Sequence, residues 1–321
     1  MSYVTTVIYL RLFMTTTVTT RQLQLDGFSV QLREAGTGAG PPLLCLHGGP
    51  GMDAAYFFPP DRFGPGLAEL AQHHHVIAYD QRGCGGSGVP DVEQPLALSR
   101  YVDDIDAIRQ ALGLQTVALL GHSFGTVLAL LYALTHSDGV SHLVLIGGAP
   151  DRAFMDGYRE AVQELPPDSQ ARLAELDCAE LTDDVFRQRF LNTLPLYFHK
   201  PLEPEDAEAF VSATSFSAQV NRSIATDLQT YDLTPALPNV RAPALVVYGE
   251  SDRVVQPRYQ LQFRGSLLTS RFVAFFESGH FPFVEEPDAF ARVTHYFLEH
   301  ADRSAGQPTV SIDFPPAPED A

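Results

Sequence analysis

Short apolar segments alternate with amphipathic segments along most of the chain. Apolar runs typical of buried strands occupy residues 42–46, 75–79, 117–120, 143–146, 244–248 and 272–276. Between them, apolar residues recur at helical spacing and predict helices over 99–112, 126–134, 257–268 and 287–299. Residues 18–33 alternate apolar and polar positions on both sides of Asp26-Gly27, which predicts a β-hairpin.

This order of elements predicts an α/β fold. Strands that alternate with helices form a mostly parallel central sheet with helices on both faces. Residues 151–236 interrupt the order, because they contain no strand-like run and several prolines break their helix-like segments. We therefore expect a core of residues 18–150 and 237–302 with residues 151–236 inserted as a helical cap. Residues 1–17 are expected to be an N-terminal extension, with Met14 a second possible start, and the proline-rich residues 303–321 a disordered tail.

Charge and cysteine content narrow the possible partners. The 321 residues include 39 acidic and 21 basic side chains, a formal charge of −18, which repels phosphate backbones and anionic lipid surfaces. Nucleic-acid and membrane partners are therefore not expected. Three cysteines (Cys45, Cys84 and Cys178) are an odd number without metal-type spacing, which favours a reducing, cytoplasmic setting over a disulfide framework.

The pentapeptide Gly121-His122-Ser123-Phe124-Gly125 stands between an apolar strand and an apolar helix, the context that a nucleophile elbow requires. A serine hydroxyl attacks a carbonyl only when a base takes its proton, so the turn must present it clear of the sheet. Such a tight turn crowds the positions two before and two after the serine, and both are glycine. The pattern predicts that Ser123 is a nucleophile.

The partners of Ser123 are expected after later strands, because ligand sites in such sheets lie beyond the carboxyl ends of the strands. Asp252 follows the 244–248 strand and His280 follows the 272–276 strand. His280 as general base and Asp252 as its orienting carboxylate complete a triad in the chain order Ser, Asp, His. His122 as the base and Glu250 in place of Asp252 are the less favoured alternatives.

Two other motifs have structural explanations that we prefer. The run Gly83-x-Gly85-x-x-Gly88 matches a dinucleotide fingerprint, but two prolines in residues 89–95 replace the helix that the fingerprint opens, so no cofactor is expected. Residues 73–75 are three histidines, but successive residues entering a strand point to opposite faces, so a solvated strand entry is favoured over a metal site.

The remaining polar positions near the site can be assigned in the same way. Asp80 and Arg82 are expected to hold their loop in place, since ion pairs are common at strand ends. The oxyanion formed during acyl transfer needs N–H donors. Phe124 is expected to supply one, and Gly49, in the glycine-rich corner after the first buried strand, the other.

With these residues in place, the chain resembles the proline iminopeptidase (prolyl aminopeptidase) family of α/β-hydrolases. The resemblance rests on His47-Gly48-Gly49-Pro50-Gly51, Asp80-Gln-Arg-Gly-Cys-Gly-Gly-Ser87, Gly121-His-Ser-Phe-Gly125, Gly249-x-x-Asp252 and Gly279-His280. It implies an α/β-hydrolase fold, a triad of Ser123, Asp252 and His280, and an oxyanion hole at Gly49 and Phe124. It also implies release of an N-terminal residue, often proline, from short peptides without a cofactor.

The chain departs from its resemblance where substrate is selected. Close relatives carry tryptophan after the nucleophile and Trp-Glu pairs in the cap, whereas this chain has Phe124 and no tryptophan. An aminopeptidase must pair a carboxylate with the substrate's ammonium. The candidate carboxylates in the cap are Glu160, Glu164, Glu203, Glu205 and Glu208, although each has the alternative of being a solvated helix-face residue.

The leading hypothesis is therefore a serine aminopeptidase that works through an acyl-enzyme. The alternative is a carboxylesterase, lactonase or amidase with the same triad. A hydrolase fold retained for ligand binding or signalling is a third possibility, which the intact triad disfavours. Serine at the elbow also disfavours dehalogenase and epoxide-hydrolase chemistry, for which related enzymes use aspartate there.

Overall fold

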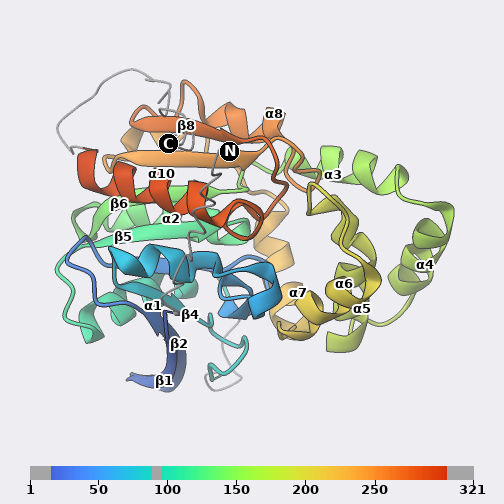
Figure 1. The fold of residues 1–321 in the computed structure, drawn as a ribbon, viewed down its shortest axis with the longest axis horizontal. Helices are drawn as coiled ribbons and strands as arrows, with labels where there is room; N and C mark the ends of the chain where they lie inside the picture. The colour runs from blue at the N-terminus through green and yellow to red at the C-terminus, as the bar shows by residue number, and fades with distance from the viewer. Residues whose placement is uncertain (1–15, 89–95, 302–321) are drawn as a thin grey trace, which may run out of the picture.

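The computed structural model describes residues 16–88 and 96–301, and residues 1–15 of the predicted N-terminal extension and the whole predicted tail lie outside these ranges. One sheet of eight strands forms the core, in the order β1-β2-β4-β3-β5-β6-β7-β8 (Figure 1). The strands are β1 (Val18–Leu25), β2 (Phe28–Ala35), β3 (Leu43–Leu46), β4 (Val76–Tyr79), β5 (Val117–His122), β6 (Val140–Ile146), β7 (Ala244–Gly249) and β8 (Ser270–Phe275).

Most of the sheet is parallel, as the order of elements predicted. The strands β4, β3, β5, β6, β7 and β8 pair in parallel, whereas β2 is antiparallel to both of its neighbours. The hairpin at Asp26-Gly27 is confirmed, since Leu25 pairs with Phe28 across the two-residue turn. The predicted α/β fold class is therefore correct.

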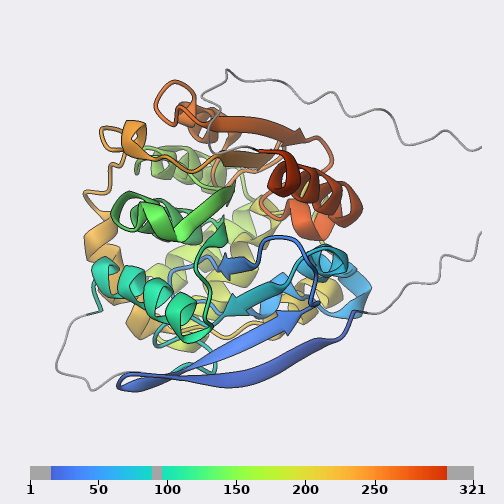
Figure 2. The same cartoon turned by 90° about the vertical axis from the view of Figure 1, so that its left-hand side faces the viewer.

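Helices cover both faces of this sheet because successive side chains of each strand point to opposite faces. In β3, Leu44 and Leu46 belong to the hydrophobic cluster that contains α1 (Leu98–Ala111) and α2 (Phe124–Thr135). Leu43 and Cys45 belong to the cluster that contains the 3₁₀ helix η3 (Gly66–Gln72) and α10 (Pro287–His300). Figure 2 shows α1 and α10 on opposite sides of the sheet. The central strands β3 and β4 are buried on both faces of the sheet, which explains why they are continuously apolar.

Five α-helices lie between β6 and β7, in residues 151–236, which we call the helical insertion. They are α3 (Phe154–Gln163), α4 (Pro167–Cys178), α5 (Asp183–Thr193), α6 (Pro204–Ser212) and α7 (Ala218–Leu228). They stand together beside one end of the sheet (Figure 1). An isolated bridge between Asp151 and Asp232 joins the two ends of the insertion. Hydrogen bonds attach α7 to the loop after β3, from Ser217 N to Gly51 O and from Asn221 Nδ2 to Pro50 O.

One predicted helix is wrong in its length. The pattern predicted a helix over 257–268, but α8 (Pro257–Gln260) has four residues and continues only as a short 3₁₀ turn, Leu261–Phe263. Arg264 is extended and Gly265 has a φ of 84°, so the helix cannot continue. The helix predicted over 287–299 agrees with α10, which follows the short α9 (Pro282–Glu285). No helix within the described ranges combines the length and hydropathy that crossing a bilayer requires.

Candidate active site

Ser123 occupies a strained turn between β5 and α2. Its φ of 55° and ψ of −118° make it the one non-glycine residue with a positive φ in the described part of the chain. A side chain at Gly121 would meet Gly125 O at 2.5 Å, and one at Gly125 would meet Leu46 O at 2.0 Å. The chain can therefore make this turn only with glycine at both positions, because neither backbone neighbour can move aside.

His280 and Asp252 lie at the ends of neighbouring strands and form a buried pair. His280 Nδ1 is 2.8 Å from Asp252 Oδ2, and both side chains are excluded from solvent. A carboxylate accepts, so Nδ1 carries the proton and Nε2 keeps a lone pair. That Nε2 is buried and has no hydrogen-bond partner among the described residues. His280 and Ser123 line the same small cavity of about 80 Å³.

Further hydrogen bonds fix the Asp252 carboxylate. Its Oδ1 accepts from the backbone N–H groups of Val254 and Val255, each at 2.9 Å. Its Oδ2 accepts from Gln260 Nε2 at 3.0 Å as well as from His280. With its oxygens held by these donors, the carboxylate cannot rotate away from the imidazole.

A chain of buried hydrogen bonds connects the loop after β3 to the loop after β8. Gly48 N–H donates to the Tyr56 hydroxyl at 2.5 Å, and that hydroxyl lies 2.8 Å from His122 Nδ1. His122 Nε2 lies 2.9 Å from the carbonyl of His280. Because a carbonyl only accepts, Nε2 carries the proton of His122 and the tyrosine donates to Nδ1. We call this chain from Gly48 to His280 the tyrosine–histidine clamp.

Burial keeps both side chains of the clamp in the required protonation state. Desolvation raises the pKa of Tyr56, so the hydroxyl retains its proton. Desolvation is the main cause that lowers the pKa of His122 well below its usual value, and the neighbouring His280 is the second. The imidazole of His122 is therefore neutral. Both ring nitrogens of His122 are engaged in the clamp, which leaves neither free to take a proton from Ser123.

The other polar residues that the sequence singled out lie away from Ser123. Glu250 is exposed at the end of β7, whereas Asp252 is the carboxylate that contacts the histidine. Asp80 and Arg82 hold their loop through separate ion pairs: Asp80 accepts from Arg33, and Arg82 donates to Asp104. The residues that follow the Gly83–Gly88 motif, 89–95, lie outside the described ranges, so the structure does not test the missing-helix argument.

Comparison with known proteins places the chain in a family. Residues 41–287 match the family model of the alpha/beta hydrolase fold. The proline iminopeptidase of Heyndrickxia coagulans is 30% identical over 274 residues, which cover 81% of this chain and 91% of that protein. The chain belongs to the proline iminopeptidase family of α/β-hydrolases. The resemblance inferred from the motifs is thereby confirmed, and the protein is a serine hydrolase.

Solved structures share the fold. The proline iminopeptidase of Mycobacterium smegmatis superposes with a TM-score of 0.68 at 24% identity, covering 88% of this chain and 98% of that one. VinJ superposes with a TM-score of 0.73 at 22% identity, covering 88% of this chain and 99% of that one. At these identities the likeness shows the architecture alone.

A larger cavity, of about 420 Å³, opens beside Ser123 between the sheet and the helical insertion. Gly49, Ser123 and Phe124 line its base, and the insertion supplies most of the opposite wall. The lining of this cavity is largely apolar and contains no aspartate or glutamate among the described residues. Arg152, an exposed residue just before α3, is the one charged side chain of that lining.

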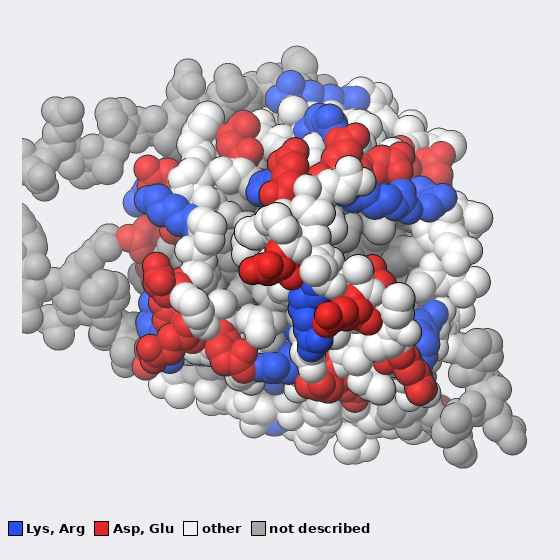
Figure 3. Space-filling model, turned by 90° about the vertical axis from the view of Figure 1, so that its right-hand side faces the viewer, with Lys and Arg blue, Asp and Glu red and all other residues white. Residues whose placement is uncertain are grey.

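The five candidate glutamates of the helical insertion are all exposed and do not line this cavity. Four of them pair with arginines at the surface: Glu160 with Arg258, Glu164 with Arg253, Glu205 with Arg62, and Glu208 with Arg187. Acidic and basic side chains are interspersed over the face that carries the insertion (Figure 3). All five carboxylates are therefore exposed at the surface, which agrees with the alternative that each is a solvated residue.

Sequence reasoning missed several residues that support the site. Tyr56, Gln260 and Asn221 hold its loops, yet they lie in unremarkable sequence and contact their partners only across the fold. His122 could have been suspected from its place beside Ser123, since a histidine in a buried elbow must find partners for both ring nitrogens.

Proposed function

We propose that Ser123, His280 and Asp252 act as a catalytic triad that hydrolyses an acyl bond through an acyl-enzyme. The observation that carries this proposal is the unpaired, buried Nε2 of His280, a residue that lines a cavity together with Ser123 while its Nδ1 is held by Asp252. Because Nδ1 already donates to Asp252, the imidazole can accept a proton only at Nε2.

The reaction would then proceed in two balanced halves. His280 Nε2 takes the proton of Ser123 Oγ as the oxygen bonds to the substrate's carbonyl carbon, and returns it to the leaving amine or alcohol. Water then loses a proton to the same nitrogen, attacks the acyl-enzyme, and the proton returns to Ser123 Oγ. Asp252 stays ionised and stabilises the imidazolium in both halves.

The oxyanion would be bound by the backbone N–H groups of Phe124 and Gly49. Phe124 is the first residue of α2, where a helix leaves its N–H groups without intrahelical acceptors. The N–H of Gly48 already donates to Tyr56, so Gly49 is the next donor of that loop. Gly49 has a φ of 123°, a conformation that favours glycine, and it lines both cavities together with Ser123.

For the substrate, we propose release of an N-terminal residue, proline or another small one, from short peptides. The family relationship and the curated proline iminopeptidases support this assignment. The apolar cavity beside Ser123 would take the side chain, and the helical insertion would act as the cap that limits what enters. Hydrolysis of prolyl and alanyl arylamides tests the assignment. Ser123→Ala should reduce kcat by about 10⁴-fold or more, and a fluorophosphonate should label the wild type at Ser123.

The charge of the cavity favours a second candidate function: a carboxylesterase, lactonase or amidase with the same triad. An ammonium bound beside Ser123 would find no carboxylate in the described lining, and an unpaired buried charge is costly. Arg152 would instead attract an acyl group that carries a carboxylate.

One parallel assay separates the two functions. We would compare kcat/KM for free prolyl arylamide, its N-blocked form, a neutral acyl ester and an ester that carries a carboxylate. A requirement for the free amine supports the aminopeptidase. Preference for the anionic ester, lost in Arg152→Gln but retained in Arg159→Gln, supports the second function. Arg159 is a matched control because it is an exposed arginine of α3 outside the cavity lining.

A further inference from the structure

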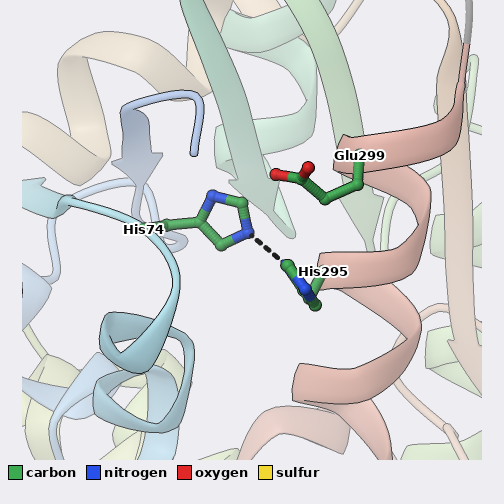
Figure 4. Close-up of side chains that lie close together, drawn as sticks. All are labelled: His74, His295 and Glu299. Carbon is green, nitrogen blue, oxygen red and sulfur yellow. Dashed lines mark hydrogen bonds between the residues drawn. The ribbon is translucent and has the colours of Figure 1, made fainter. Parts of the chain in front are cut away.

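A cluster of metal-ligating side chains lies apart from the residues assigned to catalysis, where α10 packs against the entry of β4. It contains His74, which precedes β4, and His295 and Glu299, which are one turn apart on α10 (Figure 4). One potential ligand atom from each residue lies within 4.8 Å of the others. The sequence analysis favoured a solvated strand entry for residues 73–75, which is wrong for His74. That side chain is fully buried and is joined to a helix more than 200 residues later, a contact that has no local signal.

We propose that His74, His295 and Glu299 form a binding site for a divalent transition metal, with zinc as its best fit. Two imidazole nitrogens and one carboxylate oxygen are a ligand set that zinc takes in proteins. With three protein ligands, a tetrahedral zinc would hold a water molecule in its fourth position.

The hydrogen bonds of His74 prepare it as a ligand. Its Nδ1 lies 3.1 Å from the carbonyl of Pro41, so Nδ1 must carry the proton and Nε2 keeps its lone pair. A backbone carbonyl behind a ligating imidazole is a typical outer contact, because it fixes both the tautomer and the ring plane. His74 is fully buried, so its ring is held in place by the surrounding side chains.

His295 is oriented toward that lone pair. Its Nδ1 lies 3.1 Å from His74 Nε2, close to the separation of about 3.4 Å that two ligands 2.1 Å from a tetrahedral zinc would have. The ring of His73 stacks on His295, with centroids 3.9 Å apart and an interplanar angle of 12°, which fixes the plane of the imidazole. The shared proton between the two histidines would move to His295 Nε2 when metal binds, so no proton need be released.

Glu299 supplies the negative charge of the site and lies on its solvent-exposed side. Figure 4 shows its carboxylate directed toward the two imidazoles. The ligand atoms now lie up to 4.8 Å apart, about 1 Å more than two ligands of one zinc ion would. Glu299 is exposed, so its side chain can rotate to close that difference. A metal held here would join three segments: the residues before β3 through Pro41, the entry of β4 through His74, and the last turn of α10.

The test uses the full-length protein without a histidine tag, stripped of metal with a chelator and titrated with zinc. We expect one zinc per chain and a rise in Tm of about 5 °C at a hundredfold excess over the Kd. His295→Gln and Glu299→Gln should each weaken binding by more than about tenfold. His300→Gln should not, and it is a matched control because His300 is an exposed histidine on the same last turn of α10.

Measurements in chelator show whether each variant is folded, and Glu299→Gln, at an exposed position, keeps the test valid if His295→Gln is unstable. An anomalous difference map from zinc-soaked crystals should place its peak between the three side chains. Three outcomes would overturn the proposal. They are equal zinc affinity in all three variants, an anomalous peak elsewhere, and no saturable binding at zinc concentrations up to about 100 times the protein concentration.

Discussion

Removing the hydroxyl of Tyr56 tests whether the tyrosine–histidine clamp stabilises and orders the site. Tyr56→Phe leaves the ring in place but withdraws the acceptor of Gly48 N–H and the donor to His122 Nδ1. Both groups are buried, and each buried polar group without a partner costs about 1–3 kcal/mol. We therefore expect the free energy of unfolding to fall by about 2–6 kcal/mol.

The chain offers a control of the same chemistry. The hydroxyl of Tyr79 is also buried, but it has no hydrogen-bond partner among the described residues. Tyr79→Phe therefore removes a hydroxyl without stranding another group, and we expect stability to be unchanged or slightly higher. Urea unfolding followed by circular dichroism compares the two variants under one set of conditions.

The same substitution should affect turnover. Gly48 precedes Gly49, the proposed oxyanion donor, and the loss of one such donor costs about 10²–10³ in kcat. A displaced loop should reduce kcat in Tyr56→Phe by up to that factor, with a smaller change in KM. Equal stability of Tyr56→Phe and Tyr79→Phe, or wild-type kcat in Tyr56→Phe, would refute the reasoning.

Three further predictions follow from the described contacts. Asp252→Asn should lower kcat by about 10⁴-fold while the protein stays folded, because an amide favours the wrong tautomer of the base; steady-state kinetics with circular dichroism measure both, and wild-type turnover would contradict the proposed role. Burial raises the pKa of Glu285 to about 7, so between pH 4.5 and 7 the folded state holds a proton that the unfolded state releases, and the free energy of unfolding falls as pH rises through that range. Unfolding curves should show a decline of up to about 3 kcal/mol in the wild type that Glu285→Gln lacks. Identical pH profiles of the two proteins would contradict this prediction. Gly125→Ala should prevent soluble expression or lower Tm sharply, since its Cβ meets a carbonyl at 2.0 Å, whereas Gly88→Ala, with contacts of 3.6 Å, should be tolerated.

Local pattern was sufficient for most of the fold. The central strands of the parallel sheet were predictable because they are buried on both faces and therefore continuously apolar. The helix over 257–268 was not, because Tyr259, Phe263 and Leu267 recur at helical spacing in a segment that ends as a 3₁₀ turn. Periodicity reports which side chains are buried, and a short turn can bury them as well as a helix can.

The candidate site divides in the same way. Ser123, Asp252 and His280 could be placed from sequence, since each follows a recognisable strand and parallel strands end at one edge. The order of these three residues along the chain was enough to propose them as a triad, without any knowledge of the distances between them. The surface pairing of the cap glutamates and the absence of a carboxylate from the described cavity lining had no local signal, and they bear directly on which substrate enters.

The chain by itself determined the α/β architecture and the chemistry offered at the strand ends, because strand burial, the glycines of the elbow and the order of polar residues are all local properties of the sequence. Only the tertiary structure decided how those residues are supported. The clamp joins Tyr56 to His122, and the proposed metal site joins His74 to α10. Such contacts depend on packing between segments distant in the chain, and their geometry is determined only when the sheet and its helices assemble.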